Sequence, residues 1–131
     1  MIRLAFAALL AAASPALAEP LGAADFEAYV TGNTIRYRWF GQFWGEEQYL
    51  PGRKVIWRAN GGTCQSGSWF EAAPGEICFL YGEGSGPVCW LFSRTGTGLS
   101  VQPLGEAGVE PLLESGRSSL PISCAGPEVG V

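Results

Sequence analysis

The sequence predicts an all-β fold, a small antiparallel meander that is barrel-like and disulfide-tied, with one short N-terminal helix. Short runs of alternating apolar and polar residues recur along the 131-residue chain, as they do in half-buried strands. Many of the 19 glycines and 9 prolines stand between these runs, where tight turns need them. Four cysteines at spacings unlike those of a metal site predict two disulfides.

The first 18 residues have the pattern of a signal peptide. Arg3 precedes a ten-residue apolar run at 4–13, which is too short to span a membrane. Small residues at Ala16 and Ala18 predict cleavage after Ala18 and a periplasmic or secreted protein. A buried N-terminal helix is the alternative interpretation. Removing 18 of the 131 residues leaves 113, with a net charge of −5 because Arg3 is lost and all 12 acidic residues stay.

The charge balance and the absence of histidine limit the possible functions. An acidic chain without a basic cluster argues against nucleic acid and against insertion into anionic membranes after cleavage. A chain with no histidine cannot build a Ser-His-Asp triad or a histidine-containing zinc site. We therefore expect no catalytic residues, no metal and no cofactor, although an enzyme that uses carboxylates alone is compatible with the composition.

One helix is predicted near the start of the mature chain. Phe26, Tyr29 and Val30 fall on one face of a helix over residues 25–30. Gly32 can end this helix because glycine adopts the left-handed conformation readily.

The rest of the domain is predicted to form about seven strands joined by tight turns. The first, at 34–39, alternates Ile35, Tyr37 and Trp39 with polar residues. Gly67 inside a later strand indicates a bulge or tight bend. The other strands are expected at 46–50, 54–58, 63–71, 76–81, 88–92 and 99–102.

We favour a barrel over a sandwich or an open curled sheet for this meander. Consecutive hairpins need no crossover, and closure removes exposed strand edges. Because the strands are short, we expect a barrel filled by side chains rather than a hollow one.

The register of the hairpin at 76–92 favours one disulfide pairing. If Tyr81 faces Gly86 across a four-residue loop, Cys78 lies directly opposite Cys89, within disulfide range. The remaining cysteines would then pair as Cys64–Cys124.

The four cysteines allow two other pairings. Around the turn at 71–75, Cys78 is expected to face residue 68, four residues from Cys64, or roughly 13 Å away. A Cys64–Cys78 bridge is therefore disfavoured. A third pairing, Cys64–Cys89 with Cys78–Cys124, stays open because non-adjacent strands can meet across a barrel.

The aromatic residues divide the mature chain into two parts. After the leader they all lie between Phe26 and Phe92. We therefore predict a β-meander domain at 19–103 and an aromatic-free tail at 104–131 that packs on the domain or is tethered to it.

The stretch at 40–47 is the strongest candidate for a partner-binding or ligand-binding site. Its glycines can present aromatic rings, which anchor protein partners or stack on sugars. Its two adjacent carboxylates would point to opposite faces of a strand and so form no catalytic pair. The alternative is that Phe43 or Trp44 folds inward and plugs the barrel. The candidate residues are Phe40, Phe43, Trp44, Glu46 and Glu47.

A smaller candidate surface consists of arginines. Arg36 and Arg38 share a strand face by the period of two, and Arg58 joins them if the register allows. Such a face could bind an acidic partner or could simply be solvated.

The chain resembles a family of small exported bacterial β-rich proteins of unknown function. The resemblance covers about residues 26–92 and implies no activity, ligand or catalytic residue. Cys124 and the residues after Leu104 are additions to the family pattern. The residues that carry it are Phe26, Gly32-Asn33-Thr34, Gly45-Glu46-Glu47-Gln48-Tyr49, Trp57, Cys64, Gly67-Ser68-Trp69, Ile77-Cys78-Phe79-Leu80-Tyr81 and Cys89-Trp90.

Several functions are compatible with these features. The favoured one is a non-enzymatic exported binding or interaction module with its contact surface at 40–47 and a possible protein partner. The alternative is a proteinaceous inhibitor of a secreted or envelope hydrolase, because a rigid scaffold lowers the ordering cost of binding. Two further functions come after these. One is a hollow barrel that binds a small apolar ligand, and the other is an enzyme.

Overall fold

The computed structural model is a closed barrel of eight antiparallel strands. It describes residues 19–82, 84–106 and 108–124, so the predicted signal peptide and the last seven residues lie outside the described residues. The predicted fold class is confirmed, and the barrel replaces the sandwich alternative. The elements are α1 (Ala23–Val30), β1 (Thr34–Trp39), β2 (Gln42–Leu50), the 3-10 turn η1 (Pro51–Arg53), β3 (Lys54–Ala59), β4 (Gln65–Glu71), β5 (Glu76–Tyr81), β6 (Val88–Thr95), β7 (Gly98–Pro103) and β8 (Leu112–Ser118).

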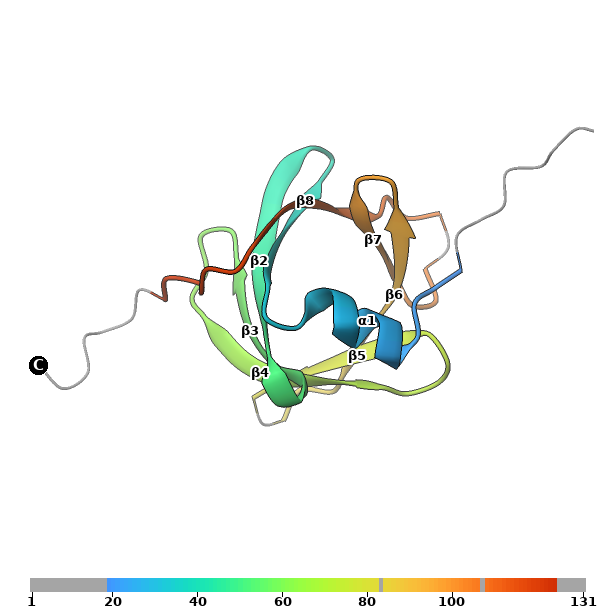
Figure 1. Cartoon of the computed structure of the whole chain (residues 1–131), viewed down its shortest axis with the longest axis horizontal. Helices are drawn as coiled ribbons and strands as arrows, with labels where there is room; N and C mark the ends of the chain where they lie inside the picture. The colour runs from blue at the N-terminus through green and yellow to red at the C-terminus, as the bar shows by residue number, and fades with distance from the viewer. Residues whose placement is uncertain (1–18, 83, 107, 125–131) are drawn as a thin grey trace, which may run out of the picture.

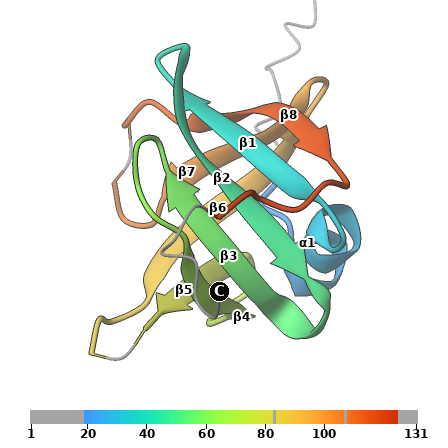
Figure 2. The same cartoon turned by 90° about the vertical axis from the view of Figure 1, so that its left-hand side faces the viewer.

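The barrel closes through a strand in the segment that we expected to be a tail. β8 pairs with β1, and its Leu112 pairs with Val101 of β7. The strand has no aromatic residue, but Leu112 and Glu114 still alternate onto the inner face. The wall therefore has eight strands rather than about seven (Figure 2).

The helix α1 lies across one end of the barrel (Figure 1). Its Phe26 and Val30 are fully buried. The Glu71 carboxylate of β4 accepts a hydrogen bond of 2.9 Å from the Ala23 backbone N–H, which places a negative charge at the helix N-terminus, where it is stabilising. Gly32, with φ of 83°, follows the helix as predicted. Within the described residues, no helix is long and apolar enough to cross a membrane.

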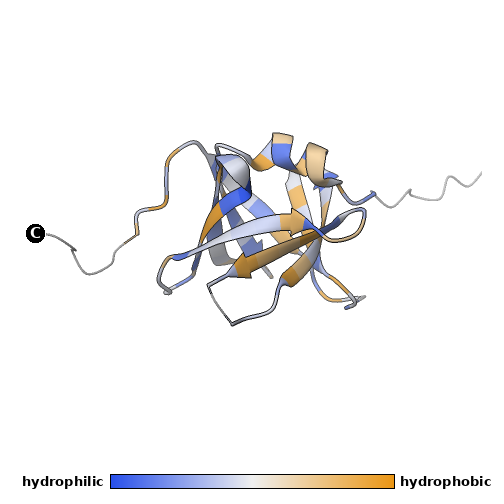
Figure 3. Cartoon of the chain, turned by 90° about the horizontal axis from the view of Figure 1, so that it is seen from below, coloured by the Kyte–Doolittle hydropathy of each residue, from blue (hydrophilic) through white to orange (hydrophobic). Residues whose placement is uncertain are grey.

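The interior next to α1 is filled with side chains. The Phe26 ring packs edge-on against Tyr49 and Trp69, with centroids 5.7 and 5.0 Å away, and lies 4.5 Å from Phe92. Hydrophobic residues recur along the strands and on the helix (Figure 3). The fully buried aliphatic side chains of this core are Val30, Ile35, Val55, Ile77 and Leu99.

The two disulfides have the pairing that the hairpin register favoured. Cys78 and Cys89 are directly paired across β5 and β6, with Cα atoms 4.0 Å apart. Cys64 bonds Cys124, with Cα atoms 5.7 Å apart. One detail of the register was wrong, because Cys78 faces Phe70 on β4 rather than residue 68.

The chain after β8 runs back across the outside of the barrel (Figure 2). The Thr34 hydroxyl donates to the Leu120 carbonyl at 2.7 Å, and the Ile122 N–H donates to the Gln48 side chain at 3.1 Å. The Cys64–Cys124 bridge then fixes this segment to the start of β4. Described residues 119–124 are therefore packed on the domain.

Candidate ligand-binding site

The half of the barrel away from α1 encloses a cavity of about 660 Å³. The expectation of an interior filled by side chains was therefore wrong for this half. Exposed lining residues such as Asn60, Gln65 and Val88 lie where β3, β4 and β6 end away from the helix, so the cavity opens on that side. Its wall includes the aromatic side chains Tyr37, Trp57, Phe79, Tyr81, Trp90 and Phe92.

Two inward-facing glycines explain why the aromatic rings leave space between them. A Cβ atom at Gly45 would lie 2.4 Å from the Trp57 ring, and one at Gly67 would lie 2.7 Å from the Tyr81 ring. Each ring therefore lies against a bare stretch of the opposite strand. The bulge or bend predicted at Gly67 was wrong, because its pairing with Tyr81 on β5 continues in unbroken register.

A buried carboxyl group stands on the cavity wall. Glu47 of β2 is only 2% exposed. Its Oε1 accepts a hydrogen bond of 2.6 Å from the Tyr81 hydroxyl, whereas its Oε2 has no hydrogen-bond partner among the described residues. Burial raises the pKa of Glu47 to about 8, and the hydrogen bond from Tyr81 offsets part of this rise. The carboxyl is therefore mostly protonated at neutral pH.

Three tyrosine hydroxyls surround this carboxyl and stay neutral. The Tyr37 and Tyr49 hydroxyls share a hydrogen bond of 2.9 Å. Burial raises the pKa of Tyr37, Tyr49 and Tyr81, and the negative charge of Glu47 raises each of them further. No lysine or arginine belongs to the described lining. Among the described lining residues, Glu47 is thus the one whose side chain can carry a charge near neutral pH.

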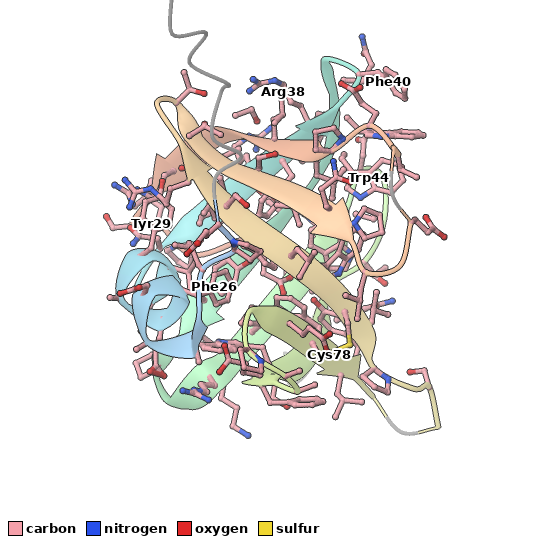
Figure 4. The ribbon with its side chains drawn as sticks, turned by 90° about the vertical axis from the view of Figure 1, so that its right-hand side faces the viewer. Phe26, Tyr29, Arg38, Phe40, Trp44 and Cys78 are labelled. Carbon is pink, nitrogen blue, oxygen red and sulfur yellow. A yellow bond between two sulfur atoms is a disulfide. The ribbon has the colours of Figure 1, made fainter. Side chains whose placement is uncertain are left out.

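Three exposed aromatic residues form a rim cluster, consisting of Trp39, Phe40 and Trp44, at the open end. The ring of Trp39 lies 4.7 Å from that of Phe40 and 5.3 Å from that of Trp44. Phe40 is 66% exposed and Trp44 is 43% exposed, and Figure 4 shows both rings far from Phe26. Trp44 therefore does not plug the barrel, although it contributes to the cavity mouth.

The predicted binding loop at 40–47 is mostly strand. Phe40 and Gly41, with φ of 47° and 75°, form the tight turn between β1 and β2. Both have the positive φ that two-residue hairpin loops use. β2 then begins at Gln42. Trp44 occupies a bulge, because Gly45 pairs with Tyr37 and Phe43 with the next residue of β1.

The structure separates the five predicted site residues into three groups. Phe40 and Trp44 belong to the rim, and Glu47 lines the cavity. Phe43 lies under the Arg36 guanidinium, 4.2 Å from its ring centroid, while also touching the mouth. Glu46 faces outward, which confirms that the two carboxylates point to opposite faces.

The arginines of the predicted outer surface have partners within the chain. Glu46 accepts from Arg36 at 3.1 Å and forms a second ion pair with Arg58. Arg38 donates to the Glu114 carbonyl at 2.9 Å. Arg36 and Arg58 thus share a face, which the sequence left open because it depends on the register, and the carboxylate between them balances part of their charge.

Sequence reasoning did not group the wall residues into a site. The period of two could have done so, because Gly45, Glu47 and Tyr49 must share one face of their strand, as must Gly67 and Trp69. The alternation pattern does not show, however, that these faces surround an open space. Trp57 was named only as a residue of the family resemblance, and Tyr81 only there and in the register of the hairpin at 76–92.

Among the described residues, no group of three or more histidine, cysteine, aspartate or glutamate side chains is placed to hold a metal ion.

Comparisons with known proteins add no family or homologous function. No protein-family model, curated protein or solved structure matches the chain.

Proposed function

We propose that the protein is a non-enzymatic binding protein that holds a small, largely apolar molecule inside its barrel. One observation carries this proposal: a cavity of about 660 Å³, walled by aromatic rings, has on its wall the buried carboxyl of Glu47, whose Oε2 has no hydrogen-bond partner among the described residues. Concave apolar sites of roughly 300–1,000 Å³ with a few convergent polar groups are typical of small-molecule binding.

The cavity wall contains two kinds of group, apolar and polar, that suit different parts of such a ligand. Trp57, Phe79 and Trp90 offer apolar surface and aromatic faces. Glu47 and Tyr81 offer a polar pair, 2.6 Å apart, that can fix the orientation of one functional group. A ligand with an apolar body and a single polar group would therefore contact both the aromatic surface and the polar pair.

We further propose a periplasmic or secreted location in bacteria. The two disulfides, Cys64–Cys124 and Cys78–Cys89, persist in oxidising compartments. The predicted signal peptide at residues 1–18 supports the same location.

Binding of a neutral naphthalene dye, N-phenyl-1-naphthylamine, tests the cavity. Wild-type protein is expected to bind the dye saturably with increased dye fluorescence. Leu112→Trp places a large side chain on the cavity wall and should weaken binding at least tenfold. Leu113→Trp is the matched control, because Leu113 pairs with Arg38 and Ser100 on the opposite face of β8, and it should bind as wild type does.

Two results would overturn the proposal. One is the absence of saturable dye binding by wild-type protein. The other is equal weakening by Leu112→Trp and Leu113→Trp. Thermal unfolding of both variants establishes that each one is folded before its dye affinity is interpreted.

The rim cluster supports a second candidate function, contact with a protein partner. Trp39, Phe40 and Trp44 expose aromatic surface together, as anchors of protein interfaces do. A hydrolase whose cleft receives the turn at Phe40 and Gly41 would make the protein an inhibitor. Pull-down from envelope extract with Phe40→Ala/Trp44→Ala should lose the partner that wild type retains. Retention of the same proteins by the double variant would contradict this candidate.

A further inference from the structure

We propose that the ligand is an organic cation, an amine or quaternary ammonium with an apolar body, and that Glu47 is its counter-ion. This inference rests on the proposed function and specifies the charge of the molecule that the cavity takes. It follows from the charges of the wall, the geometry at Glu47 and the aromatic faces around it.

The charges of the wall favour a cation over an anion. Glu47 is the only described lining residue that can carry a full charge near neutral pH, and no arginine or lysine lines the cavity. Arg36 on β1 and Arg58 on β3, the register partners of the adjacent Glu46, are bound to Glu46 on the outer face. A ligand carboxylate or phosphate would therefore be buried beside a carboxyl group with no cation to pair with, which is strongly unfavourable.

The geometry at Glu47 leaves one carboxyl oxygen without a hydrogen-bond partner among the described residues. Oε1 already accepts the hydrogen bond from Tyr81, and Oε2 has no partner in the part of the chain that the structure describes. A buried polar atom without a partner costs free energy that a ligand can recover. Oε2 itself has almost no accessible surface, so a rotation of the Glu47 carboxyl toward the cavity would let a ligand ammonium recover this cost and gain a charge-assisted contact.

The aromatic rings near Glu47 present faces that attract cations. Trp57 is the register partner of Glu47 on β3. Phe79 and Tyr81 lie on the same inner face of β5, with their rings nearly parallel and 6.2 Å apart. The negative π-face of an aromatic ring attracts an ammonium ion, and tryptophan does so most strongly. A neutral ligand would gain the apolar contacts but not this attraction.

Binding of a cation should remove a proton from Glu47. The titratable groups that face Glu47 are Tyr81 of β5, Tyr37 of β1 and Tyr49 of β2, with Glu114 beyond Tyr37. The tyrosines stay neutral below pH 9, so Glu47 is the group among them whose titration would control binding. Its proton would pass to solvent as the ion pair with the ligand forms. Affinity for a permanent cation should therefore rise with pH up to about 8 and then level off.

Two probes of matched shape test the charge. Benzyltrimethylammonium carries a fixed positive charge, and neopentylbenzene replaces its nitrogen with carbon. Displacement of N-phenyl-1-naphthylamine at pH 8.5 should show at least a tenfold preference for the cation. Between pH 6 and pH 9, the affinity of wild-type protein for the cation should rise about 100-fold, because Glu47 with a pKa of about 8 must ionise first.

Substitution of the two neighbouring glutamates isolates the role of Glu47. Glu47→Gln keeps the shape and a hydrogen-bond acceptor but cannot ionise, so it should lose both the preference for the cation over neopentylbenzene and the pH dependence. Glu46→Gln makes the same change on the outer face and should keep both. If Glu47→Gln does not fold, the pH profile of the wild-type protein alone decides.

The outcomes separate this inference from the proposed function. Equal affinities for the two probes, or an affinity for the cation that falls above pH 8, would overturn the cation and leave an apolar binding site. Failure of wild-type protein to bind the dye and both probes would overturn the proposed function and the cation with it.

Discussion

The two ends of the barrel both contain aromatic residues, but these residues are buried at one end and exposed at the other. At the helix end, the Phe26 ring contacts three other aromatic rings and is fully buried. At the open end, Trp39, Phe40 and Trp44 contact mainly one another, and Phe40 is two-thirds exposed. Both ends are rich in aromatic residues, so composition does not separate them.

The difference is whether another element covers the strands. α1 brings Phe26 and Val30 into one end and completes a core there, because inward side chains pack only when something fills the space between them. At the other end Gly45 and Gly67 let rings lie along the wall, and no described helix covers the opening. The same alternation along the strands thus produces a core at one end and a cavity at the other.

The largest expected effect concerns Glu47, which lies between the two ends. Its pKa of about 8 in the folded protein exceeds the ordinary 4.5, so the folded state binds more protons than the unfolded state between these values. The free energy of unfolding should therefore fall as the pH rises from about 4.5 to about 8. Relative to wild type, Glu47→Gln should gain about 5 kcal/mol over this range. Urea unfolding of both proteins at pH 4.5, 6 and 8.5 measures the difference.

The comparison with Glu47→Gln cancels the titration of every other group. Glu46→Gln provides a second reference, because Glu46 is paired with Arg36 and Arg58. A difference between wild type and Glu47→Gln that stays constant with pH would contradict the assignment of a raised pKa to Glu47.

Much of the fold could be predicted because it depends on local patterns. The strand at 34–39 and the hairpin at 76–92 are clear from alternation and turns. Counting along this hairpin placed Cys78 opposite Cys89, as the structure has it. The strand Leu112–Ser118 was not predicted, because its only large apolar residues are two adjacent leucines and therefore give no alternation signal.

The site could be predicted only in part, because it depends on contacts between distant strands. Glu47 was a candidate, but on a surface loop rather than inside the barrel. Whether a barrel is filled depends on which inward positions are glycine and on what covers each end. The approach of Trp57 to Gly45 follows from a register between two strands that no local pattern specifies.

Truncation of one phenylalanine at each end tests the contrast directly. Phe26→Ala should cost about 4 kcal/mol in the free energy of unfolding, because it removes a fully buried ring at the centre of the core. Phe40→Ala should change it by less than about 0.5 kcal/mol, because the ring is 66% exposed. Denaturant unfolding of both variants under the same conditions measures the two costs. Similar losses would show that the rim cluster stabilises the fold as the core does.

An effect smaller than that of Phe26→Ala is expected at the cavity wall itself. A Cβ atom at Gly45 would lie 2.4 Å from the Trp57 ring and 2.8 Å from the Arg58 carbonyl oxygen. Gly45→Ala should therefore force the ring of Trp57 toward the cavity and cost about 2 kcal/mol. It should also weaken dye binding, because the displaced ring occupies space that the ligand uses.

Gly116→Ala is the matched control for this substitution on the wall. Gly116 also lies in a strand, β8, but its Cβ atom would meet only the Arg36 side chain, at an ordinary 3.7 Å. This variant should keep wild-type stability and dye affinity, measured by denaturant unfolding and dye titration. If Gly45→Ala behaves as Gly116→Ala does, the wall yields to a methyl group, and the open space does not depend on a glycine beneath Trp57. If only Gly45→Ala loses affinity, the absence of a side chain at residue 45 keeps this half of the barrel open.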